Sequence, residues 1–274
     1  MSAAGAAGGR RRFLAPRRGQ VPPACFAHPL FAGFDECRDL MTSADWPGIE
    51  LLNARLPLPD KRFFAQDAAL LADGLHYEVR IGERGCIATR TANWHDLFNA
   101  MVWMRHPAIK LALNARQCRH IAVMGPNRRN RAQAALTQFD ETGLVLRVGD
   151  AGLLAAWDRH DWRALFVDGA AQWHDGSIAI AAVIGHALME QALLPGRLLV
   201  GKCVVVQGDD DDAGVARVAE AIAKGEVLDD PLQLRPLPLA GIPGWHSCQD
   251  DGFHAQRDYF RPLRAGRVYP PPLT

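Results

Sequence analysis

The pattern of apolar and polar positions becomes regular near the middle of the chain. Apolar and polar residues alternate over 76–81, a period typical of a half-buried strand. A turn with two glycines follows at 82–85, and residues 86–90 have the composition of a second strand. The pattern therefore predicts a β-hairpin over residues 76–90.

A helical period begins directly after this predicted hairpin. Asn93 is a preferred residue for capping a helix N-terminus, and the apolar positions of 94–105 recur with helical spacing. Pro107 is disfavoured in a helix interior and tolerated in a first turn. We therefore expect one helix over 94–105 and another over 108–118.

The second half of the chain alternates between the two periods. We expect strands over 144–148, 177–184 and 198–206, and helices over 128–139, 151–157, 162–166, 186–194 and 212–224. This order indicates crossover connections and some parallel pairing. The proline-rich stretch from Pro231 predicts coil. The predicted fold class is α/β or α+β: a single mixed domain with an N-terminal β-hairpin plus helix unit and a C-terminal strand–helix–strand–helix half.

Composition adds bounds to this picture. The chain has 274 residues, of which 49% are hydrophobic and 22% charged, values typical of a globular protein that needs no disulfide or metal for stability. The arginine-rich start predicts a disordered basic tail over 1–22, followed by one globular domain over 23–274. No apolar run reaches the length of a secretory signal or a membrane span, and none of the six cysteines forms a C-x-x-C pair. We therefore expect a cytoplasmic protein with reduced thiols and no membrane partner.

Charge argues against a general nucleic-acid binder. The chain carries 31 basic and 30 acidic residues, for a net charge of +1. One local basic segment could contact phosphates, although a solvated loop is the simpler interpretation; its residues are Arg116, Arg119, Arg128, Arg129 and Arg131. The acidic run over 209–212 favours a helix N-terminus and lacks the spacing of a calcium loop.

The first candidate site lies at the junction between the predicted hairpin and its helix. His95 and Asn99 are four residues apart and Asp96 and Asn99 are three apart, so the side chains share one helix face. Imidazole, carboxylate and amide groups together can bind a metal or hold a general base. The helix N-terminus should favour the neutral form of His95. The alternative is a polar cap without chemistry.

The second candidate site opens the predicted helix after strand 177–184. His186 and Glu190 are four residues apart, and sites in α/β sheets collect beyond the carboxyl ends of strands. A helix-start histidine with a solvated glutamate is the alternative. If both candidate sites meet in space, His95, Asp96 and His186 become the expected metal ligands. A G-x-S-x-G elbow, a P-loop and a G-x-G-x-x-G motif are absent from the sequence.

Several motifs together resemble a known family. They are NWHDLFNAMVWMRHPAIKLALN from Asn93, LTQFDETG from Leu136, GHALMEQALLP from Gly185, PLPLAGIPGW from Pro236 and YFRP from Tyr259. In this order they resemble the bacterial family called domain of unknown function 3025, over about residues 23–264. The resemblance implies a one-domain bacterial protein and no particular activity. The family pattern continues Asn-Ala-Arg-His, and this chain has Gln117 in place of that histidine. A role of that histidine is therefore not expected here unless His120 substitutes for it.

Two functions follow as hypotheses. The first is a metal-assisted hydrolase that uses a divalent metal, with His95 and Asp96 as ligands or base and His186 and Glu190 completing the site. A nuclease variant would use the predicted hairpin and helix as a ββα unit and the basic segment for phosphates. The second is a non-catalytic binding or interaction module, in which the same polar groups tie loops together.

Overall fold

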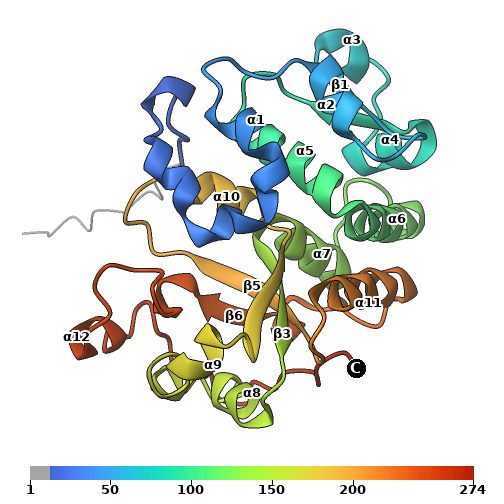
Figure 1. Cartoon of the computed structure of the whole chain (residues 1–274). Coiled ribbons are helices and arrows are strands. Elements are labelled where there is room, and N and C mark those ends of the chain that lie inside the picture. The colour runs from blue at the N-terminus through green and yellow to red at the C-terminus, as the bar shows by residue number, and fades with distance from the viewer. Residues whose placement is uncertain (1–12) are drawn as a thin grey trace, which may run out of the picture.

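The larger of two sheets forms the centre of the protein. The computed structural model describes residues 13–274, and residues 1–12 lie outside that description. Four strands follow one another in space in the order β4-β3-β5-β6 (Figure 1). They are β3 (Gly143–Val148), β4 (Ile178–Val183), β5 (Val200–Val206) and β6 (Arg235–Pro238). Strands β3 and β5 are parallel, as the crossover pattern predicted, and the other two neighbouring pairs are antiparallel.

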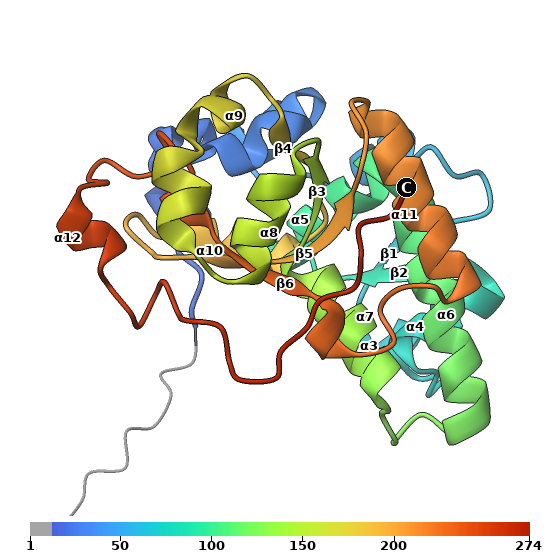
Figure 2. The same ribbon diagram turned by 90° about the horizontal axis from the view of Figure 1, so that it is seen from below.

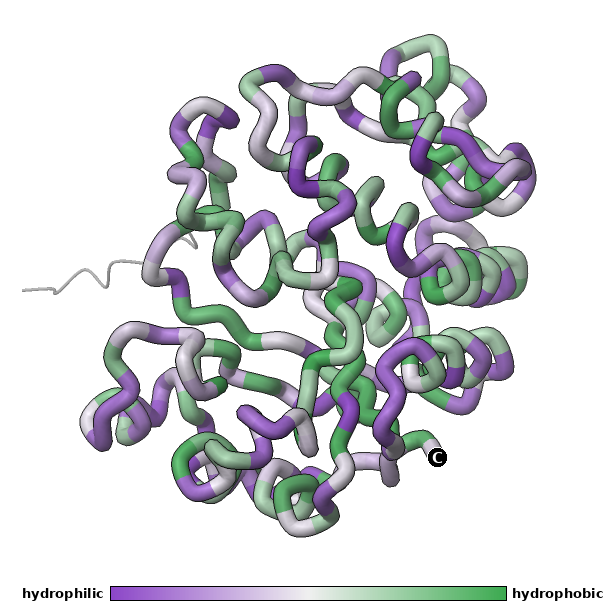
Figure 3. Tube along the Cα trace, viewed as in Figure 1, coloured by the Kyte–Doolittle hydropathy of each residue, from purple (hydrophilic) through white to green (hydrophobic). Residues whose placement is uncertain are grey.

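Apolar residues form these strands because helices cover the sheet. Leu144, Val145 and Leu146 of β3 are fully buried, and Cys203 and Val206 of β5 are as well. Figure 3 shows the hydrophobic residues gathered along these strands. Helix α7 (Arg131–Thr142) lies above the sheet in Figure 1, and α8 (Ala151–Asp158) and α9 (Ala170–His174) lie below it. Helix α11 (Asp211–Lys224) contacts β3, β4 and β5 and packs along α6.

The N-terminal half packs over the α7 side of the sheet. Its two long helices are α5 (Trp94–Arg105), with the predicted bounds, and α6 (Pro107–Met124), which runs six residues beyond the predicted end at 118. Short elements surround them: 3₁₀ turns at Arg18–Gln20, Pro23–Ala27 and Pro29–Cys37, with α1 (Arg38–Thr42), α2 (Ile49–Arg55), β1 (Arg62–Ala65), α3 (Ala68–Leu71), α4 (Tyr77–Arg84) and β2 (Cys86–Thr89). Helix α10 (His186–Ala192) lies between α5 and α7 and contacts both. This contact brings the two halves of the chain together.

The predicted β-hairpin over 76–90 is wrong. Its first half is helix α4, which begins where the His76 side chain accepts a hydrogen bond from the Glu78 amide. The helix ends at Gly85, whose φ of 65° suits a left-handed C-cap that a side chain would disfavour. Strand β2 pairs in parallel with the distant β1 instead. The ββα unit of the nuclease variant is therefore absent from this part of the chain.

The two ends also differ from the expectations. Of the predicted tail over 1–22, the first twelve residues lie outside the described part, and the rest packs against the domain. Arg18 is buried and donates to the Leu40 carbonyl, and Trp94 donates to the Pro16 carbonyl. The predicted C-terminal coil contains β6, 3₁₀ turns at Pro231–Gln233 and Leu239–Gly241, and α12 (Asp251–His254). Figure 2 shows this segment crossing beneath the sheet edge.

The connection between α8 and α9 carries a short π-helical turn, Ala164–Asp168, where a helix over 162–166 was expected.

Among residues 13–274, no helix combines the length and the hydropathy that a membrane span requires.

Candidate functional site

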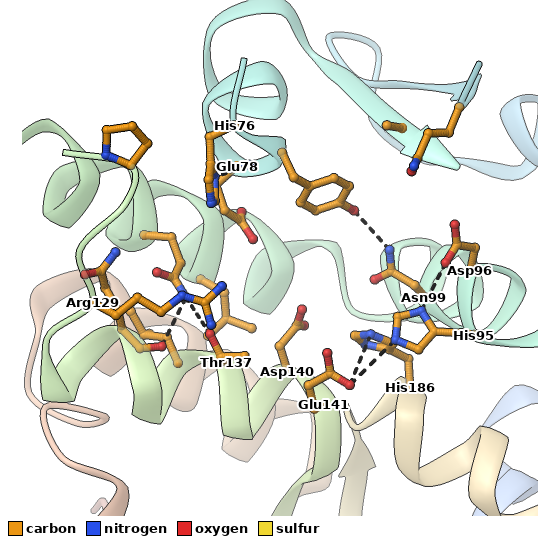
Figure 4. A pocket seen from close by; sticks show the side chains of 18 of the residues that line it. His76, Glu78, His95, Asp96, Asn99, Arg129, Thr137, Asp140, Glu141 and His186 are labelled. Atoms are coloured by element: carbon orange, nitrogen blue, oxygen red, sulfur yellow. Dashed lines mark hydrogen bonds and ion pairs between the residues drawn. The ribbon is translucent and has the colours of Figure 1, made fainter. Parts of the chain in front are cut away.

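A polar pocket opens between the N-terminal helices and α7. Its volume is about 310 Å³, and Figure 4 shows its walls. The side chains that line it come from β2, α4, α5, α6, α7 and α10, from the loop before α7, and from residues next to β1, β2 and α4. The polar members are Gln66, His76, Tyr77, Glu78, Arg90, His95, Asp96, Asn99, Gln117, Arg129, Gln133, Thr137, Asp140, Glu141 and His186. The two candidate sites predicted from sequence therefore share one pocket.

His95, Glu141 and His186 form a cluster at one end of this pocket. The Nε2 atom of His95 lies 3.6 Å from a carboxylate oxygen of Glu141, and Nε2 of His186 lies 4.0 Å from the same oxygen. The two imidazole rings meet edge to face, with centroids 4.5 Å apart. One ligand atom from each residue falls within 4.8 Å of the others. The structure thus brings together the two histidines, whose meeting in space the sequence left open.

Local sequence places each of the three cluster residues. Asn93 caps α5 through its side chain, which fixes His95 in the first helical turn. Glu141 stands in the last turn of α7. His186 is the first residue of α10, directly beyond Gly185 and the end of β4. A Cβ at Gly185 would lie 2.6 Å from the Thr142 Cα, so only glycine lets these segments approach so closely.

The charge state of His95 differs from the expectation. Burial lowers the pKa of His95, but hydrogen bonds to Asp96 and Glu141 and the charges of both carboxylates outweigh it and raise the pKa to about 9. The prediction that the helix N-terminus keeps His95 neutral is therefore wrong for the metal-free protein. Neighbouring carboxylates dominate over the helix dipole here.

His186 has the opposite environment. Its side chain is buried, and burial lowers its pKa to about 4, a shift that the charges of Lys110 and His95 reinforce and those of Asp140 and Glu141 oppose. Its Nδ1 atom is buried and has no hydrogen-bond partner among the described residues. A neutral imidazole is the form that ligates metals.

Asp96 borders the cluster through His95 but is not one of its ligand residues. One of its oxygens accepts from the Arg90 backbone amide at 2.6 Å, and the other from the Arg90 guanidinium at 2.7 Å. It also lies 3.0 Å from Nδ1 of His95. The structure does not bring Asp96 into the group of ligand atoms, and it leaves Asp96 as a partner of the ligand His95.

The other two predicted site residues occupy the edges of the cluster. Asn99 donates to the Tyr77 hydroxyl at 3.1 Å and accepts from Lys110 at 2.8 Å. Glu190 is half-buried, and burial raises the pKa of its carboxyl group. Glu190 does not line the pocket, so the predicted His186–Glu190 pair is not brought together around it.

Sequence reasoning missed the acidic end of α7 and its partner on α6. The buried ammonium of Lys110 lies 2.5 Å from an oxygen of Asp140. Burial favours the neutral form of Asp140, but the charge of Lys110 prevails and lowers the pKa of that carboxyl group. Asp140 and Glu141 belong to the LTQFDETG motif, which was used only for the family resemblance. The motif places two carboxylates directly after the expected helix end at residue 139, and this pair could have indicated an acidic group at the site.

Glu78 is a further carboxyl group on the pocket wall. Burial raises its pKa to about 7, against the hydrogen bond from Asn114 and the charges of Lys110 and Arg129. The Nδ2 atom of Asn114 donates to it at 2.7 Å. Because residues 76–81 were predicted to form a strand and not helix α4, Glu78 and its neighbour Tyr77 were not predicted as pocket residues.

The predicted basic segment is mostly engaged within the protein. Arg116 pairs with Asp229, Arg131 pairs with Asp230, and Arg119 donates to the Ala223 carbonyl. Arg128 and Arg129 take part in no ion pair between described residues, and Arg129 lines the pocket. Phosphate contacts by the whole segment remain a prediction. Three of its five guanidinium groups already bond to other groups of the protein.

The fold and this pocket define a mixed α/β protein with a cluster of two histidines and one carboxylate at one end of a polar cavity. The chain belongs to the family described as protein of unknown function (DUF3025), whose family model matches residues 61–264, and the resemblance predicted from sequence is confirmed. No curated protein and no solved structure matches the chain. All the pocket residues lie within the matched range.

Proposed function

We propose that this protein is a metal-dependent hydrolase whose divalent cation is held by His95, Glu141 and His186. The observation that carries the proposal is the convergence of their ligand atoms within 4.8 Å from three different helices. Two histidines and one carboxylate are the protein ligands of many catalytic zinc sites, which leave a fourth position for water or substrate. Non-haem iron uses a similar set, so the metal must be identified by experiment.

The distances support binding with little rearrangement. Tetrahedral bonds of about 2.0–2.2 Å set ligand atoms about 3.3–3.6 Å apart. The separations of 3.6 and 4.0 Å from Glu141 to the two imidazoles need only a small contraction. The negative charge that favours a cation here comes from Glu141, because the carboxylates of Asp96 and Asp140 are already paired with Arg90 and Lys110.

Hydrolysis needs a group that accepts a proton from water. Asp140 is the candidate, because it lines the pocket beside Glu141 and Lys110 favours its ionised form. In the proposed reaction, water loses a proton to Asp140 as its oxygen bonds to the substrate's electrophilic atom. The bond to the leaving group then breaks, and Asp140 returns the proton to the leaving group. The cation polarises the group under attack.

The test combines metal analysis with a hydrolase screen. Purified protein is loaded with zinc, manganese or iron(II), and binding is measured for the wild type and for His186→Ala and Glu141→Gln. We expect about one tightly held ion per wild-type chain and a large loss in both variants. The control is Glu190→Gln, which removes a nearby carboxylate outside the cluster and should retain the ion.

Activity is then screened with ester, amide and phosphoester substrates on the loaded protein. Hydrolysis that Glu141→Gln abolishes and Glu190→Gln retains supports the proposal. A wild-type protein that binds none of these ions at micromolar concentration would refute it. Such a result would favour the alternative hypothesis of a non-catalytic interaction module, in which the polar cluster only joins α5, α7 and α10.

A further inference from the structure

The end of the pocket opposite the metal-ligand cluster has a different chemistry. Figure 4 shows Arg129 and His95 at opposite ends, with Glu78 between them on the upper wall. Arg129 lies in the loop before α7 and is exposed. Its positive charge acts on the pocket wall: together with burial it lowers the pKa of His76, and it opposes the burial that raises the pKa of Glu78. The pocket therefore has an exposed arginine at one end, while the carboxylates at the other end are paired with Arg90, His95 and Lys110.

Arg129 lines this pocket and forms no ion pair with another described residue. Arg90 is bound by Asp96, and Lys110 by Asp140. Arg129, in contrast, pairs with no carboxylate among residues 13–274. A guanidinium group offers a fork of donors that matches a carboxylate or a phosphate in two parallel hydrogen bonds.

We propose, building on the proposed hydrolase function, that the substrate is a small molecule whose carboxylate or phosphate group is held by Arg129 while its hydrolysable bond lies at the His95–Glu141–His186 cluster. The pocket volume of about 310 Å³ suits a small molecule, being at the lower end of the range for such sites. The charge distribution also fixes the orientation of the substrate. At the other end of the pocket the cations Arg90, His95 and Lys110 are already paired with carboxylates, so the anionic group binds at the Arg129 end.

Glu78 supports this assignment from the pocket wall. Its carboxyl group titrates near neutral pH, so a large share of it is protonated in mildly acidic solution. In that form it can donate a hydrogen bond to an anion next to Arg129. An ionised carboxylate in the same place would repel the anion.

The inference can be tested without a metal and without an activity. Ligand-observed NMR compares binding of N-acetylglycine to the metal-free protein with binding of N-acetylglycinamide, in which a neutral amide replaces the carboxylate. Inorganic phosphate is titrated in parallel. We expect the charged probe to bind at least about tenfold more tightly than its amide, as a charge-assisted hydrogen bond implies. Arg129→Gln should remove that difference.

The matched control is Arg128→Gln. Arg128 is the preceding exposed arginine and does not line the pocket, so its loss should leave the preference for the anion intact. Equal losses in both variants would show a nonspecific surface charge effect and overturn the inference. Preference for N-acetylglycine assigns a carboxylate substrate, preference for phosphate assigns a phosphate, and binding of neither overturns the inference.

The outcome for the metal is separate. If zinc binds but Arg129→Gln changes no anion affinity, the anion site is wrong and the metal site stands. If the anion binds through Arg129 but no ion binds the cluster, the anion site stands and the hydrolase proposal fails.

Discussion

The Nδ1 atom of His95 lies 3.0 Å from a carboxylate oxygen of Asp96, its neighbour along the helix. Asp96 is itself fixed by the backbone amide and the guanidinium of Arg90. With Nδ1 engaged in this way, Nε2 of His95 faces Glu141. In many metal sites, the ring nitrogen of a ligating histidine that does not bind the metal donates a hydrogen bond to a carboxylate. This hydrogen bond sets the orientation of the ring and raises the basicity of the ligand nitrogen.

Asp96→Asn should therefore weaken metal binding while leaving the ligands in place. Loss of such a supporting carboxylate typically lowers metal affinity about 10–100-fold. Competition with a chelating dye measures the zinc affinity, and urea unfolding checks that the variant folds. The positioning role would be disproved if Asp96→Asn bound zinc like the wild type while His95→Ala lost it.

The two histidines could be predicted as site residues because each follows a clear local signal. His95 stands two residues after the capping Asn93, and His186 follows an apolar strand and a glycine. Their meeting in space could not be derived, since it depends on how α10 packs against α5 across the whole domain. Glu141 was missed because the apolar period of α7 fades at Phe139, although the helix continues to Thr142.

The misassigned helix α4 has a physical explanation too. Alternation of apolar and polar residues over only six positions is compatible with a strand and also with a short amphipathic helix. Tertiary contacts decide which of these two structures forms. Helix α4 packs on α6, and Asn114 of α6 donates to the Glu78 backbone carbonyl at 2.9 Å. The true partner of β2 is β1, more than twenty residues upstream, and short-range pairing rules favour a neighbouring strand instead.

Gly185→Ala should separate His186 from Glu141. The new methyl group would lie 2.6 Å from the Thr142 Cα and 2.8 Å from the Gly143 nitrogen, both of which are backbone atoms. Overpacking of this kind costs about 1–3 kcal/mol of unfolding free energy. We expect lower stability in urea and weaker zinc binding by the folded fraction.

Gly149→Ala is the matched control for this substitution. Gly149 follows β3, and its added Cβ would meet only the Ser177 carbonyl oxygen, at an ordinary 3.5 Å. This variant should fold and bind zinc like the wild type. Unchanged zinc affinity in Gly185→Ala would mean that the close approach does not position His186.

Glu78 should make stability depend on pH near neutrality. Its pKa rises from 4.5 to about 7 on folding, so between these values the folded state holds a proton that the unfolded state has released. The free energy of unfolding therefore falls as pH rises through this window, by at most about 3 kcal/mol from this group. The charge of Asp140 adds to this upward shift of the Glu78 pKa, and the charges of Lys110 and Arg129 oppose it.

Glu78→Gln should remove this dependence. Urea unfolding of wild type and variant is compared at pH 5 and pH 8, and the variant should gain stability relative to the wild type at the higher pH. Glu83→Gln, an exposed change on the same helix, gives the reference for loss of a carboxylate. A difference between Glu78→Gln and wild type that stays constant with pH would contradict the prediction.

The buried pair of Lys110 and Asp140 should be strongly coupled. The Lys110 side chain is only 4% exposed, and its ammonium bonds Asp140 at 2.5 Å and Asn99 at 2.8 Å. Lys110→Met leaves a carboxylate in the protein without its counter-charge, which costs about 3–5 kcal/mol of unfolding free energy. Adding Asp140→Asn removes that stranded charge, so the double variant should recover part of the loss.

An exposed pair on α11 provides the comparison. Lys224 and Glu220 lie 2.7 Å apart, but their side chains are 55% and 64% exposed, so water already screens both charges. Lys224→Met should therefore change stability far less than Lys110→Met does, with little coupling to Glu220. Similar double-mutant coupling energies for the two pairs would show that Lys110 is as well solvated as Lys224. In that case a buried lysine would not explain why Asp140 is ionised. Another interaction would have to keep Asp140 ionised beside Glu141.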